Sequence, residues 1–100
     1  MTRLGAITEK IRSKNAGPFW LTVDIFCGDT PTFERVSQAL ATRDVATLFG
    51  ADPASMKRFD IPALNVIKFS LPRPVIQGAI NDPDMHGASW AALLQEFRIA

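Results

Sequence analysis

The stretch that decides the fold is Phe19-Trp20-Leu21-Thr22-Val23-Asp24-Ile25-Phe26, residues 19–26. Apolar residues occupy every second position from Phe19 to Ile25, and the positions between them include Thr22 and Asp24. This period-two alternation, rich in β-branched and aromatic residues, is typical of a strand with one buried face. We therefore predict a strand over residues 19–26 whose Phe19–Ile25 side faces the core.

Two helical segments follow this strand. Asp29 or Thr30 can cap a helix that has Pro31 in its first turn. Its apolar stripe continues to Leu40. Thr42 can cap a second helical stretch that runs through residue 49, with Gly50 as its stop. Alternation then returns, which predicts a short strand over residues 56–61 and a longer strand over residues 65–71.

The two ends of the chain carry weaker patterns. Leu4, Ile7 and Ile11 have helical spacing, so we predict an amphipathic helix over residues 4–12 that stops before Gly17 and Pro18. Residues 90–99 fit both helical spacing and alternation. We predict a strand from Leu93, preceded by a helical turn over residues 88–92.

These elements together predict one α+β domain over residues 1–100. The order resembles a ferredoxin-like sheet of about four mainly antiparallel strands, with helices on one face and an extra N-terminal helix. The predicted core collects the inward-facing apolar residues: Phe19, Leu21, Val23, Ile25, Phe33, Val36, Leu40, Leu48, Phe59, Ile67, Phe69 and Leu71.

Composition excludes several classes of function. Eleven Lys and Arg residues balance ten Asp and Glu residues, so the net charge is +1 and predicts neither a nucleic-acid partner nor an anionic membrane. A single cysteine, Cys27, and a single histidine, His86, exclude an intramolecular disulfide and a multi-histidine or cysteine-based metal site. We expect a cytoplasmic protein without a cofactor or a bound metal.

Three segments carry a family resemblance. They are Arg12-Ser13-Lys14-Asn15-Ala16-Gly17-Pro18-Phe19, Pro72-Arg73-Pro74, and Asp82-x-Asp84-x-His86-Gly87-Ala88. Together they resemble the uncharacterised small proteins that accompany acyclic terpene utilisation (AtuA-like) proteins, a domain type also found fused to the end of the large partner. The resemblance implies a ferredoxin-fold domain and a large protein partner, and it implies no reaction.

Two clusters of polar residues are candidate binding sites. Arg12, Lys14 and Asn15 could bind an anion, although cations at the end of a helix also simply oppose its dipole. Asp82, Asp84 and His86 could hold a divalent metal if extended, but Asn81-Asp82-Pro83-Asp84 is also an ordinary turn, and we favour the turn. Asp24 is interpreted as half of a cross-strand ion pair, and Cys27 as a buried thiol.

The sheet face opposite the helices is a candidate interface. If the alternation is right, Trp20 lies there with Val66 and Leu94, among charges of both signs. A tryptophan among aliphatic residues favours an interface over a solvated surface, with a larger protein, a homo-oligomer, or both as the partner.

Two functions remain open. The chain is either a non-catalytic accessory or interaction domain, or a subunit that completes the active site of an enzyme acting on a small carboxylate or acyl thioester. In the second case Arg12, Lys14 and Arg73 would bind the anion, and Asp24 or His86 would transfer a proton. Convergence of these residues in one cleft would favour the enzyme.

Overall fold

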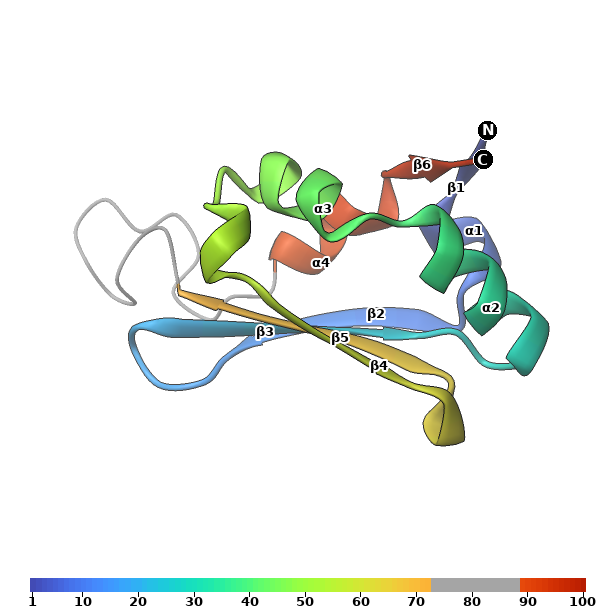
Figure 1. Cartoon of the computed structure of the whole chain (residues 1–100), viewed down its shortest axis with the longest axis horizontal. Helices are drawn as coiled ribbons and strands as arrows, with labels where there is room; N and C mark the ends of the chain where they lie inside the picture. Colours follow the sequence, from blue (N-terminus) through green and yellow to red (C-terminus); the bar gives the residue numbers. More distant parts are fainter. Residues whose placement is uncertain (73–88) are drawn as a thin grey trace.

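The computed structural model describes residues 1–72 and 89–100. Its elements in chain order are β1 (Thr2–Arg3), α1 (Leu4–Ile7), β2 (Lys10–Asn15), β3 (Trp20–Phe26), α2 (Thr30–Ala39), α3 (Thr42–Phe49), the 3₁₀ turn η1 (Pro53–Ser55), β4 (Lys57–Ile61), the 3₁₀ turn η2 (Pro62–Leu64), β5 (Val66–Pro72), α4 (Ser89–Gln95) and β6 (Arg98–Ile99). The architecture is mixed α+β, and Figure 1 shows the α-helices on one side of the long strands.

The main sheet has four strands in the order β2-β3-β5-β4, and every neighbouring pair is antiparallel. Its centre is β3, as its alternation predicts, because Leu21, Val23 and Ile25 are completely buried under the helices. A second sheet of two strands pairs β1 with β6, which brings the two ends of the chain side by side (Figure 1).

The helices form where the capping residues indicate. The Asp29 carboxylate accepts a hydrogen bond from the backbone N–H of Thr32 at 2.8 Å and so caps α2, with Pro31 in the first turn. Gly50 ends α3 in the left-handed conformation, at φ 67°. The predicted cap of α3 is wrong: Thr42 is the first residue of the helix, and Ala41 occupies the cap position without a side-chain hydrogen bond.

The predicted N-terminal helix is wrong beyond Ile7. Residues 10–15 form β2, whose hairpin partner is β3. Ile11 is buried and lies opposite Ile25 in the sheet. Leu4, Ile7 and Ile11 all contact the same core, so they are apolar at helical spacing although Ile11 belongs to a strand. Gly17 has a positive φ of 79°, as a stop signal predicts, but it lies in the β2–β3 turn and not at a helix end.

The predicted C-terminal strand is also mostly wrong. Residues 89–95 form α4, and only Arg98–Ile99 is extended, in the small sheet with β1. The fourth strand of the main sheet is therefore β2, which comes from the N-terminal side. A simple ferredoxin order would place a C-terminal strand beside β3, so the observed order differs from that fold.

Most of the predicted core is buried, with two corrections. Leu48 packs at its border, while the other helix and strand positions are almost fully enclosed. Phe19 is exposed because it precedes β3, in the hairpin turn. Phe59 is exposed because it lies on the sheet face opposite the helices. No helix in residues 1–72 and 89–100 is long and apolar enough to cross a bilayer.

Candidate functional site

The strand register defines a surface that we call the open face, the side of the main sheet on which no described helix lies (Figure 1). Directly paired residues on neighbouring strands share a face. From β2 to β4, the open face consists of three rows: Lys10, Phe26, Val66 and Ile61; Arg12, Asp24, Lys68 and Phe59; and Lys14, Thr22, Ser70 and Lys57. Beyond the third row, Trp20 lies opposite Pro72.

Positive charge is concentrated on the open face. Its three rows hold five cations, of which three lie on β2, one on β5 and one on β4, and a single carboxylate, Asp24. The formal charge of the face is therefore +4, whereas the whole chain carries +1. It follows that the rest of the chain carries −3, so the near-neutral composition hides a strongly polarised charge distribution.

Two large apolar side chains are exposed on the same face. Trp20 is 40% exposed and Phe59 is 49% exposed. Other apolar residues of the face are covered locally: Val66 is buried, and the Lys10 ammonium lies 4.9 Å from the centre of the Phe26 ring. The open face thus combines cations with an exposed indole and an exposed phenyl ring.

The loop motif Arg12, Lys14 and Asn15 does not form one site. All three lie on β2, where successive side chains alternate between the two faces of the sheet. Arg12 and Lys14 are exposed on the open face, whereas Asn15 pairs with Leu21 and belongs to the face under the helices. The helix-dipole explanation for the two cations fails, because no helix ends there.

Arg73, Asp82 and His86 lie outside the described residues, and so does Asp84. Convergence of the whole predicted set in one cleft is therefore unsupported, and Asn15 already diverges from Arg12. Asp24 lies between Arg12 and Lys68 in the second row, where a cross-strand pair would form, but the ion pairs found among the described residues do not include Asp24.

The structure places two of the three residues of the predicted interface on the open face. Trp20 and Val66 lie on the open face, as the alternation predicts. Leu94 does not: it is a fully buried residue of α4 in the hydrophobic core. Residues 90–99 fit both alternation and helical spacing, and residues 89–95 form a helix. The alternation that predicted Leu94 on the open face therefore does not apply.

The sequence reasoning missed Lys10, Lys57 and Phe59 as members of the open face. The alternation of residues 57–61 predicts a strand whose apolar side, with Phe59, faces the core. In the structure the inward side of β4 is polar, because Arg58 reaches back to α2. Its guanidinium donates hydrogen bonds to the carbonyl oxygens of Ser37 and Leu40 and to the Asp60 carboxylate.

Cys27 is a structural thiol. It is buried beside the helix layer, and burial, assisted by the nearby carboxylates of Asp29 and Asp60, raises its pKa to about 11. The thiol is therefore neutral at physiological pH and lacks the thiolate that a nucleophile needs. Among the described residues, no group of three His, Cys, Asp or Glu side chains could hold a metal ion.

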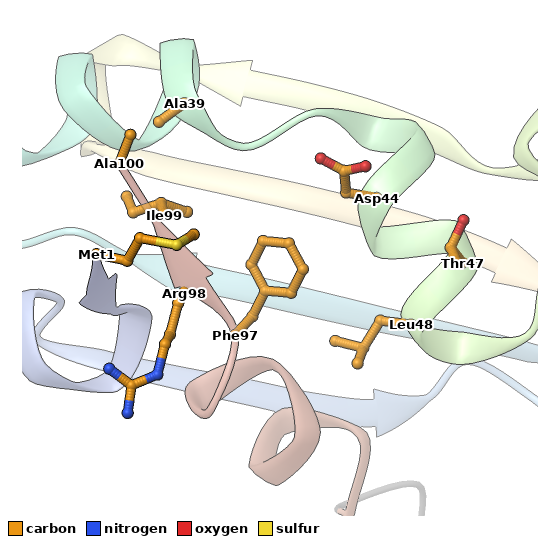
Figure 2. A pocket seen from close by; sticks show the side chains of 9 residues that line it. All are labelled: Met1, Ala39, Asp44, Thr47, Leu48, Phe97, Arg98, Ile99 and Ala100. Carbon is orange, nitrogen blue, oxygen red and sulfur yellow. The ribbon is translucent and has the colours of Figure 1, made fainter.

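A hollow of about 480 Å³ lies elsewhere, between α3 and the two ends of the chain. Figure 2 shows Phe97 and Leu48 among the side chains that line it, with Asp44 on the α3 side and the Arg98 side chain directed away from that carboxylate. Its few polar groups do not converge on a common point, as they do in sites that orient a ligand. We assign no chemistry to this hollow.

Comparison with known proteins gives one match. A family model described as Domain of unknown function (DUF4387) matches residues 4–98, almost the whole chain. No curated protein and no solved structure matches the chain.

Proposed function

We propose that this chain, which belongs to the DUF4387 family, is an interaction domain that binds a larger protein through the open face of its sheet. The observation that carries the proposal is the exposure of Trp20 and Phe59 on a face that the described helices leave uncovered. The activity of the family itself is unknown.

The exposed rings favour a protein contact. Trp20 and Phe59 are both exposed on the open face, and aromatic side chains are enriched at protein interfaces relative to the rest of the surface. Here the helix-covered side of the sheet buries Leu21, Val23 and Ile25 completely, so the chain has a full core without Trp20. Tryptophan is also among the residues that contribute most to binding at interfaces.

We propose a large acyclic terpene utilisation (AtuA-like) protein as the partner. The resemblance that suggests it is strongest over residues 12–19. These residues form most of β2 and the turn that leads into β3, so they border the open face and supply Arg12 and Lys14 to it. The most family-like segment and the candidate docking surface therefore coincide.

Co-purification tests this function. The tagged chain is co-expressed with the large partner, in the wild type, in Trp20→Ser and in the matched control Leu93→Ser. Leu93 is 45% exposed but lies on α4, on the other side of the molecule. Both substitutions remove one exposed apolar side chain and leave the net charge unchanged.

We expect the wild type and Leu93→Ser to retain the partner and Trp20→Ser to bind it at least roughly tenfold more weakly. Failure of the wild type to retain the partner would reject this partner. Equal binding by Trp20→Ser and Leu93→Ser would reject the open face as the docking surface.

A further inference from the structure

We infer that the surface which docks on the open face is acidic: a protein patch of carboxylates beside an apolar residue. This inference rests on the proposed function and adds the chemistry of the partner. It is carried by the five cations and one carboxylate that the strand register gathers on one face. A partner of complementary charge is attracted to such a face and oriented by it.

The third row of the face shows how carboxylates would be bound. Lys14 and Lys57 occupy the two edge strands, about 14 Å apart for three strand spacings. Ser70 lies between them and offers a hydroxyl group as a hydrogen-bond donor, whereas the buried Thr22 already donates its hydroxyl to the carbonyl oxygen of Lys14. Trp20 is next along β3 and supplies the apolar contact at the edge of this polar strip.

A second copy of the chain does not fit this surface. Two open faces related by a two-fold axis would bring like patches together, each with a formal charge of +4. Such a juxtaposition of cations is unfavourable. Lys10 and Arg12 fall within the helix predicted over residues 4–12, and Lys14 follows it. The structure places all three on the open face, and their charge is what makes this pairing of faces unfavourable.

A single-stranded nucleic acid fits less well than a protein. Sheet surfaces that bind single strands stack several bases on open aromatic rings of neighbouring strands. Of the two central strands, β5 carries no aromatic residue on the open face. On β3 the Lys10 ammonium lies over the Phe26 ring, which leaves Trp20 as the one open ring of these two strands, too few to stack several bases. Asp24 also places a carboxylate in the middle of the face, where a phosphate backbone would pass.

The test compares two charge-reversal variants of the full chain. Lys14→Glu/Lys57→Glu removes positive charge from the open face. Arg43→Glu/Arg98→Glu makes the same change in net charge, from +1 to −3, at exposed residues of α3 and β6. Binding to the large partner is measured over a range of NaCl concentrations, and a glutamate-rich peptide and an oligothymidylate of equal charge are titrated as simple probes.

We expect Lys14→Glu/Lys57→Glu to bind the partner and the glutamate-rich peptide at least roughly tenfold more weakly than Arg43→Glu/Arg98→Glu, and added salt to weaken the wild type. If the two variants weaken binding equally, or if salt does not weaken binding by the wild type, the inference of an acidic partner is wrong. A loss of binding in Trp20→Ser would still support the open face as the docking surface. Tighter binding of the oligothymidylate than of the peptide would replace the protein partner by nucleic acid. If the large partner fails to bind, the peptide titration alone decides.

Discussion

Arg58 shows how one residue can decide which side of a strand faces the core. It lies on the inner side of the edge strand β4, and its guanidinium is 5.7 Å from the centre of the Phe69 ring. It also donates to the carbonyl oxygens of Ser37 and Leu40 at the end of α2, which have no partner within the helix. One cation therefore completes the C-terminal end of a helix and turns Phe59 outward.

Replacing Arg58 tests this role. Arg58→Met keeps most of the volume of a side chain that is only 17% exposed, but it leaves two helix carbonyls and the Asp60 carboxylate without their donor. We expect the free energy of unfolding to fall by about 2 kcal/mol, which lowers the melting temperature by roughly 10 °C in a domain of this size. Thermal unfolding followed by circular dichroism measures this change.

Arg58→Lys is the matched control, because it keeps the charge and loses the fork of donors. We expect a melting temperature between those of the wild type and Arg58→Met. A melting temperature of Arg58→Met equal to that of the wild type would contradict the assigned role.

At the scale of elements, the sequence correctly predicts the helices and strands whose local residue pattern matches the burial of their side chains. Strand β3 alternates cleanly, and α2 has a cap, a proline in its first turn and an apolar stripe. Strand β2 has only Ile11 as an apolar residue, because its outer side is cationic and its inner side holds Ser13 and Asn15. A strand with one apolar residue leaves no period-two signal, so neither β2 nor the cations that it adds to the open face could be predicted.

Strand β2 is positioned by contacts that are distant in sequence. Its Ser13 hydroxyl accepts a hydrogen bond from the backbone N–H of Ala91, in the first turn of α4, at 2.9 Å. This bond satisfies a helix N–H that has no intrahelical partner. Sequence periodicity is local and does not contain such a contact, which is why both ends of the chain were misassigned while its middle was predicted.

The cap of α2 gives the protein a measurable acid dependence. Hydrogen bonds from the Thr32 side chain and from its backbone N–H lower the pKa of the Asp29 carboxyl below its ordinary value of 3.8. The folded state therefore favours the ionised carboxylate. Its contribution to stability is present above pH 3.8 and is lost as the pH falls through the lowered pKa of the folded state.

We expect Asp29→Ala to melt at a lower temperature than the wild type at pH 7, and the difference to shrink as the pH falls below about 4. Asp29→Asn keeps a hydrogen-bond acceptor without a charge, so we expect it to lower the melting temperature less than Asp29→Ala does. Its difference from the wild type should also narrow in acid, because the wild-type carboxylate is then protonated. Melting curves over a pH series measure both differences. A deficit of Asp29→Ala that is as large at pH 2 as at pH 7 would contradict an ionised cap.

At the scale of the whole molecule, the open face and the remainder of the chain differ in the sign of their net charge. The open face carries +4, and the remainder of the chain carries −3. The helices lie on the other side of the sheet, and the core is enclosed between them and the sheet (Figure 1). The net charge of +1 does not reveal this concentration of cations, which is why composition alone could not indicate the sign of the partner.

This separation predicts the behaviour of the isolated chain in solution. Repulsion between open faces is strongest at low ionic strength, because the Debye length is then longest. We therefore expect light scattering coupled to size exclusion to show a monomer of 11.0 kDa in low salt. The variant Lys14→Glu/Lys57→Glu reduces the charge of the open face from +4 to zero and so removes this repulsion. If this variant is also a monomer, the exposed rings alone do not drive association. A wild-type dimer that is stable in low salt and is lost in Trp20→Ser would contradict the prediction, because it would show that apolar contacts outweigh the repulsion of the paired cations.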